Sequence, residues 1–86
     1  MTPLTWAPEA VRQVIGIAHG DQRTAERIEK AVAQYARDGV GDVQKLAGPG
    51  EEWRLRVGDW RVRFVYEAPP RRIHVLRVLN RRDAYD

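Results

Sequence analysis

The stretch Trp53 to Phe64, which reads WRLRVGDWRVRF, decides the fold. Apolar residues alternate with arginines on both sides of Gly58-Asp59, and this period of two is typical of strands with one core face and one polar face. Because Gly58-Asp59 is a tight-turn signal, the stretch predicts a β-hairpin. Four side chains then share the face opposite the core: Arg54, Arg56, Arg61 and Arg63.

The residues before the hairpin predict a short strand and two helices. Residues 1–6 alternate like a strand, and Pro8 suits the first turn of a helix. Apolar residues at the spacing of one buried helical stripe follow, namely Val11, Val14, Ile15 and Ala18. Asp21 is a candidate N-cap for a second helix, which runs to about Arg37. Within it, Glu26 and Lys30 have the spacing of a favourable i, i+4 ion pair.

The residues around the hairpin complete the order of elements. Residues 39–52 contain four glycines and a proline and are predicted to be a loop. After the turn at residues 68–71, Ile73 to Leu79 forms a nearly continuous apolar run, as expected of a central strand. The chain is therefore predicted to be one α+β domain over residues 1–86. Its order is β-α-α-β-β-β, with an antiparallel sheet and a helical hairpin packed on one face.

Charge is distributed unevenly along the chain, whose net charge is +3. Residues 1–52 carry six basic and eight acidic side chains, whereas residues 53–86 carry nine arginines and four acidic side chains. The guanidinium group offers a planar fork of donors that matches phosphate oxygens. A high-GC genome would also favour arginine over lysine, but it would not gather arginines in one half. The second half therefore predicts a phosphate-binding face, with a solvated face balanced by Asp59, Glu67 or a partner protein as the alternative.

Composition excludes several other kinds of site. The chain has no cysteine and only two histidines, far apart in sequence, so no metal site of soft ligands and no cofactor is expected. His74 is expected to be a buried structural residue. The N-terminus does not resemble a signal peptide, and no apolar run approaches the length of a membrane span. A cytoplasmic protein is the expectation.

Four blocks of the sequence together resemble the RelE/ParE superfamily of bacterial and archaeal toxins. They are Leu46-Ala47-Gly48, Trp53 to Val62, Val75-Leu76-Arg77-Val78, and Arg81 to Tyr85. The resemblance spans the whole chain and favours the RelE-like branch. It implies a toxin of a type II toxin–antitoxin system, with a separate antitoxin protein as its partner.

The resemblance to the RelE branch also implies an activity: cleavage of mRNA in the ribosomal A site, with ribosome and mRNA as partners. By position, Arg61 matches a transition-state-stabilising arginine, Arg81 an arginine that assists the leaving oxygen, and Tyr85 a tyrosine that orients or deprotonates the 2′-hydroxyl. The expected RNA-binding residues are Arg54, Arg56, Arg63 and Arg82. The sequence departs from the pattern at Asn80, where many relatives have His or Lys.

Two alternatives remain open. The ParE branch shares the fold and most of the hairpin, and implies a non-enzymatic toxin that blocks DNA gyrase by protein contact. A family member without toxicity is the other. The joint occurrence of Arg61, Arg81 and Tyr85 favours the nuclease, whereas Asn80 favours the gyrase inhibitor.

Overall fold

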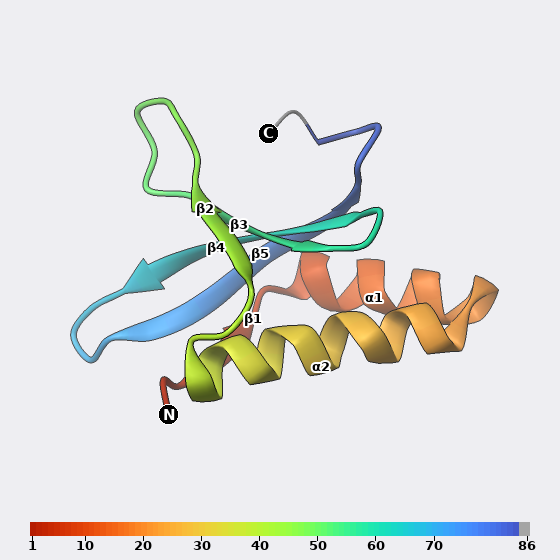
Figure 1. Ribbon diagram of the computed structural model, residues 1–86, viewed down its shortest axis with the longest axis horizontal. Coiled ribbons are helices and arrows are strands. Elements are labelled where there is room, and N and C mark those ends of the chain that lie inside the picture. The colour runs from red at the N-terminus through yellow and green to blue at the C-terminus, as the bar shows by residue number, and fades with distance from the viewer. Residues whose placement is uncertain (85–86) are drawn as a thin grey trace.

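The computed structural model describes residues 1–84 and forms two layers, a pair of helices against one face of a sheet (Figure 1). The elements are β1 (Leu4–Trp6), α1 (Pro8–Gly20), α2 (Gln22–Asp38), β2 (Asp42–Lys45), β3 (Trp53–Val57), β4 (Trp60–Glu67) and β5 (Arg72–Asn80). The predicted α+β fold with a helical hairpin on one face is confirmed. The hairpin predicted from the alternation is the β3–β4 pair, joined at Gly58-Asp59.

The sheet differs from the prediction in two details. Its strand order is β1-β5-β4-β3-β2, so the segment predicted as a loop contributes a fifth strand, β2. This strand is short and polar, and Val43, opposite Leu55, is its one residue packed against the core. The other difference is that β1 pairs with β5 in parallel. The helical hairpin carries the chain from β1 at one edge of the sheet to β2 at the other edge, and the antiparallel strands β2 to β5 then lead back until β5 lies beside β1. β5 thereby lies between β1 and β4, an inner position that agrees with its apolar sequence.

Capping interactions define the helical hairpin. The Asp21 carboxylate accepts hydrogen bonds from the Thr24 hydroxyl at 2.7 Å and the Thr24 backbone N–H at 3.2 Å. These bonds lower the pKa of Asp21, since they favour its ionised form. At the other end of α2, Gly39 adopts a left-handed φ of 71°, and its N–H donates to the Tyr35 carbonyl. Asp21 therefore acts as the predicted N-cap, and Gly39 ends the helix after Asp38, close to the predicted end at Arg37.

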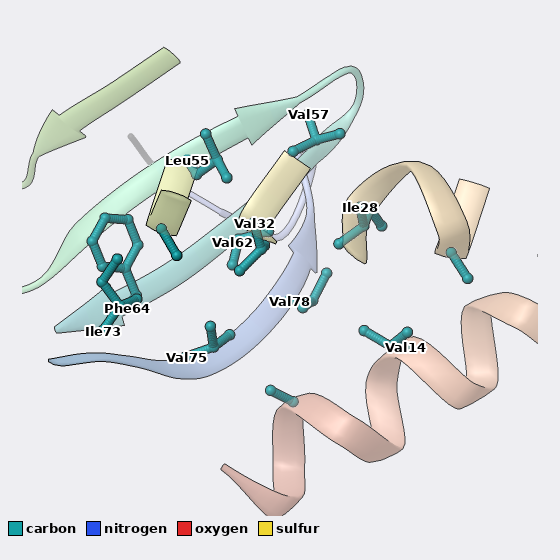
Figure 2. Close-up of a cluster of buried hydrophobic side chains, with 13 residues drawn as sticks. Val14, Ile28, Val32, Leu55, Val57, Val62, Phe64, Ile73, Val75 and Val78 are labelled. Carbon is teal, nitrogen blue, oxygen red and sulfur yellow. The ribbon is translucent and has the colours of Figure 1, made fainter. Parts of the chain in front are cut away.

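The core lies between the sheet and the two helices, as Figure 2 shows. Its fully buried side chains include Ile28 of α2, Val62 and Phe64 of β4, and Val75 of β5. The stripe predicted for α1 was too wide. Val14 is buried, but Val11 and Ile15 are 42% and 51% exposed. They line an open apolar cavity of about 360 Å³ beside Leu4 and Trp6 of β1, where the sheet ends and covers them only in part.

An aromatic group closes the core at the end of the sheet near the β4–β5 turn. Tyr66 makes edge contacts with Trp53 and Phe64, and its hydroxyl lies 2.5 Å from that of Tyr35. The Arg71 guanidinium lies over the Tyr66 ring, 4.5 Å from its centroid. Burial, together with the Tyr66 hydroxyl, raises the pKa of Tyr35 to about 12.

Substitution of Ile28 tests the position of the core. We expect Ile28→Ala to lower the free energy of unfolding by about 2–5 kcal/mol, because it opens a cavity at a fully buried site. Ile15→Ala is the matched control on α1, where half the side chain is already exposed, and should cost less than about 1 kcal/mol. Urea denaturation measures both. Equal losses would contradict the described core.

The tyrosine pair predicts how stability falls in alkali. The folded pKa of Tyr35 lies above its ordinary value of 10.0, so its contribution is complete below pH 10 and is lost as pH rises through about 12. Tyr66→Phe removes the neighbouring hydroxyl and should move the pKa of Tyr35 back toward 10. Ultraviolet titration of tyrosinate in wild type and variant checks this. A late-titrating tyrosine that is unchanged in Tyr66→Phe would exclude the pairing.

Candidate nucleic-acid interface

The sheet face opposite the helices carries six arginines. Arg72 lies at the β4–β5 turn, opposite Glu67, and the other five form a group that we call the arginine face: Arg54, Arg56, Arg61, Arg63 and Arg77. Arg54, Arg63 and Arg77 are direct cross-strand neighbours on β3, β4 and β5. Arg56 and Arg61 form a second cross-strand pair on β3 and β4. The alternation of the hairpin correctly predicted that its four arginines share this face.

Arg77 was missed as a site residue because of an irregularity in β5. The register changes between Arg63↔Arg77 and Phe64↔Val75, which leaves Leu76 as an extra residue on β5. A bulge of this kind reverses the inward–outward alternation beyond it. Counting alternate residues from Val75 would place Arg77 on the core side, whereas the bulge places it beside Arg63. An arginine inside an otherwise apolar strand was the only sequence signal for this arrangement.

Acidic side chains make this concentration of positive charge possible, since like charges opposite one another in a sheet are destabilising. The Glu52 carboxylate lies 3.4 Å from a terminal nitrogen of Arg63 and 3.2 Å from one of Arg77. The Asp42 carboxylate lies 3.3 Å from Arg54 and 3.9 Å from Arg56. The face therefore carries its own counter-ions, Asp42 and Glu52, neither of which the sequence had singled out.

The acids named in the sequence-based alternative lie elsewhere. Glu67 pairs with Arg72 at 2.8 Å, and Asp59 lies 3.7 Å from Arg81. Asp42 and Glu52 instead come from the segment predicted as a loop. Once that segment forms β2 and the connection to β3, Asp42 lies directly opposite Arg56.

Exposure divides the arginines into two groups. Arg54 and Arg61 are 5% and 7% exposed, whereas the side chains of Arg56 and Arg77 are 48% and 39% exposed. Arg54 donates to the Asp42 carbonyl at 3.0 Å and to the Gln44 side-chain oxygen at 2.8 Å. The buried Nε–H groups of Arg63 and Arg77 have no hydrogen-bond acceptor among the described residues. The face thus offers the half-exposed guanidinium groups of Arg56 and Arg77, whereas Arg54 and Arg61 are buried and engaged in internal hydrogen bonds.

The β3–β4 turn brings Arg61 and Arg81 together. Arg61 donates to the carbonyl oxygens of Gly58 at 3.0 Å and Trp60 at 3.2 Å. The Arg81 backbone N–H donates to the Asp59 carbonyl at 2.7 Å, and its side chain is 68% exposed. Two predicted catalytic arginines therefore flank one turn, Arg81 open to solvent and Arg61 largely covered.

Arg82 is the remaining predicted site residue that the structure describes, and it follows the end of β5. Arg82 is exposed, and its backbone N–H donates to the Asn80 side chain at 3.2 Å. The Asn80 side chain thus has a structural role in the chain's exit from the sheet. Tyr85 lies outside the described residues. His74 is half-buried rather than buried, and its Nδ1 lies 2.7 Å from the Thr5 hydroxyl.

Within residues 1–84 the structure contains no cluster of His, Asp or Glu that could hold a metal ion. No helix in this part of the chain is long and apolar enough to cross a bilayer.

Comparison with known proteins identifies the fold. The family profile described as "ParE toxin of type II toxin-antitoxin system, parDE" matches residues 4–85. The YoeB/ParE toxin from Agrobacterium tumefaciens superimposes with a TM-score of 0.76 at 18% identity, covering 92% of this chain and 98% of that one. A chain of the archaeal RelE–RelB complex from Pyrococcus horikoshii OT3 superimposes with a TM-score of 0.75 at 21% identity, covering 96% of this chain and 98% of that one. A chain of the RelB–RelE complex from Methanococcus jannaschii superimposes with a TM-score of 0.69 at 23% identity, covering 95% of each chain. No curated protein sequence matches significantly.

Glu52 offers a direct test of the arginine face. Glu52→Gln should lower the free energy of unfolding by about 1–3 kcal/mol, because it leaves two partly buried guanidinium groups without their shared carboxylate. The neighbouring Glu51→Gln is the control. Glu51 is 77% exposed in its contact with Lys45, and its loss should cost less than about 1 kcal/mol. Denaturant titration compares the two, and equal stability of both variants would argue against the role of Glu52.

Proposed function

Because the chain belongs to the ParE toxin family of type II toxin–antitoxin systems, we propose that this toxin cleaves mRNA in the ribosomal A site and so inhibits translation. The observation that carries the proposal is the convergence of Arg61 and Arg81 on the β3–β4 turn, at the edge of the arginine face. Phosphate groups of a single RNA strand laid across this face would meet Arg56, Arg77 and Arg81, whose side chains are substantially exposed.

The proposed chemistry uses the RNA's own 2′-hydroxyl as nucleophile. Its oxygen attacks the adjacent phosphorus as its proton leaves, and the bond to the 5′ oxygen breaks as that oxygen gains a proton. The guanidinium groups of Arg61 and Arg81 stabilise the additional negative charge on the phosphate. Neither arginine acts as a base, since guanidinium stays protonated. Tyr85 orients the 2′-hydroxyl in this proposal.

The proposed catalytic set of Arg61, Arg81 and Tyr85 includes no side chain whose ordinary pKa lies near neutrality, and this supports a contribution of the ribosome to catalysis. Asn80 does not titrate, and His74 is held by Thr5 on the strand pair at the far edge of the sheet. A tyrosine with an ordinary pKa of about 10 is a weak base at neutral pH. Alignment of the 2′-hydroxyl with the phosphate can supply about 7–11 kcal/mol of the barrier. A message fixed in the decoding site has that alignment, whereas a free strand does not.

A ParE-type inhibitor of DNA gyrase is the second candidate. The matching family profile favours it by name, and so does the burial of Arg54 and Arg61, which fixes these side chains in internal bonds. In that function, the arginine face and the turn would contact protein rather than RNA. The two candidates differ in the first process that stops when the toxin is induced.

The antitoxin is proposed to cover the arginine face with an acidic or amphipathic segment. Arg56 and Arg77 are exposed enough to meet its carboxylates, and the cytoplasm is the proposed compartment, where mRNA and ribosomes meet. An electrostatic seal of this kind weakens with salt, because exposed charges are screened over about 10 Å at 0.1 M ionic strength.

Single-turnover cleavage of one message, naked and ribosome-bound, tests the proposed site. Arg81→Ala and Arg61→Ala should each slow cleavage roughly 10²–10³-fold, as expected for removing one stabiliser of developing charge. Tyr85→Phe should slow cleavage with little change in ribosome binding. Arg72→Ala, which removes a surface arginine paired with Glu67, is the control and should cut normally. Thermal melts of each variant separate misfolding from loss of chemistry, which matters for the buried Arg61.

Several outcomes would contradict this proposal. Equal cleavage of naked and ribosome-bound message would remove the ribosome requirement, and full activity of Arg81→Ala would remove the assigned site. Pulse labelling after induction compares the two candidates. Protein synthesis should stop before DNA synthesis, and the reverse order would favour the gyrase inhibitor.

A further inference from the structure

The polar side of α2 carries a second set of cations, which meets the arginine face of the sheet only at Arg56. Arg23, Arg27, Lys30 and Gln34 follow one another at spacings of four, three and four residues, which places them in one stripe along the helix. This stripe lies against the β3–β4 turn. Together they line an open groove of about 530 Å³, here called the α2 groove: Arg23, Glu26, Arg27, Lys30, Ala31, Gln34, Arg56, Val57 and Gly58.

The three cations that α2 contributes to the groove are not neutralised by a neighbouring carboxylate. Glu26 is the one acid that lines the groove, and its fourth cation, Arg56, lies 3.9 Å from the Asp42 carboxylate. The ion pair predicted between Glu26 and Lys30 does not form, and the Glu26 carboxylate accepts a hydrogen bond from Gln22 at 3.3 Å instead. Among the described residues, Arg23, Arg27 and Lys30 make no ion pair. They differ in this from Arg63 and Arg77, whose charges are met by Glu52.

One of these cations, Arg27, packs closely against the turn. The terminal nitrogens of Arg27 lie 3.0 and 3.3 Å from the position that a Cβ at Gly58 would occupy. Gly58 has a left-handed φ of 58°, so the absence of a side chain there serves both the turn and the close approach of Arg27. Arg61 donates to the carbonyl of the same glycine. Arg27 of the α2 groove and the predicted catalytic Arg61 and Arg81 therefore lie against the same turn.

We propose that the α2 groove binds the phosphate backbone of a double-helical RNA, which is distinct from the strand that is cut. Three α2 cations over seven residues span roughly 10 Å of helix, a length that reaches successive phosphates. The groove contains no aromatic residue, and single-stranded nucleic acid is typically held by base stacking on aromatic side chains. Its only aliphatic side chains are Ala31 and Val57, too few for the apolar centre of a protein–protein interface.

This inference rests on the proposed function in one respect, namely that the nucleic acid bound by the groove is RNA. A toxin that works on a ribosome-bound message must also contact structured RNA that it does not cut, and the α2 groove is the described surface whose chemistry fits that contact. Binding by this groove involves no catalytic residue. It is therefore measurable on RNA that resists cleavage.

Fluorescence anisotropy with a short 2′-O-methyl RNA hairpin, which lacks the nucleophilic hydroxyl, tests the proposal. The groove variant is Arg23→Gln/Arg27→Gln/Lys30→Gln, in which glutamine keeps the helix propensity. The control is Arg12→Gln/Arg37→Gln/Arg72→Gln, which removes the same charge from exposed positions outside the groove. We expect the groove variant to bind roughly tenfold or more weakly, with a salt dependence reduced by about 2–3 ion equivalents. Circular dichroism confirms that both variants are folded.

Equal affinity of the groove variant and the control would overturn the proposal. A poly-glutamate peptide is measured in parallel. If the groove variant loses more affinity for the peptide than for the hairpin, the groove binds an acidic protein segment and the proposal fails. Hairpin binding through the groove by a chain that cuts no message would retain this inference and overturn the proposed nuclease. Normal cleavage with no contribution of the groove to hairpin binding would do the opposite.

Discussion

The pairing of Asp42 and Glu52 with the arginine face is the interaction on which the rest of the structure depends. Arg54, Arg63 and Arg77 lie opposite one another on three neighbouring strands, an arrangement that like charges disfavour. Glu52 lies between two of these arginines and Asp42 beside the third. The segment from β2 to the start of β3 is therefore part of the site, although it carries none of the predicted site residues. The half-exposed arginines that remain are the part of the face available to an anionic partner.

The positive charges of this small protein are of two kinds: arginines of the sheet that are paired with carboxylates, and cations of α2 that are not. On the sheet, an incoming phosphate would meet arginines that already have carboxylate partners, and its binding would involve exchange with them. On α2 the cations have no such partners, so contact there needs no exchange. A surface of the second kind gives fast and weakly selective attachment, whereas one of the first kind selects the ligand that competes best with its own acids.

Much of the fold was predictable from the sequence because its signals were local. The alternation around Gly58-Asp59 gave the hairpin and the shared face of Arg54, Arg56, Arg61 and Arg63, and Asp21 and Gly39 marked the limits of α2. The features that were missed depend on distant partners. β2 exists because β3 offers it an edge, and Val11 and Ile15 are exposed because the sheet ends at β1. The burial of Arg61 and the convergence of Arg61 with Arg81 likewise required the tertiary structure.

The bulge at Leu76 affects how this chain is to be aligned with its relatives. In a relative whose last strand lacks the extra residue, the residue that corresponds to Arg77 in space comes one position earlier in the sequence. An alignment without a gap therefore does not pair it with Arg77. Such an alignment would match Arg77 with a core residue and would hide an arginine that the two proteins share in space. If β5 paired with β4 without this bulge, Leu76 would take the place of Arg77 on this face and Arg77 would turn toward the core. Evolution can therefore add or remove a cation here through a change of register, without substituting any side chain.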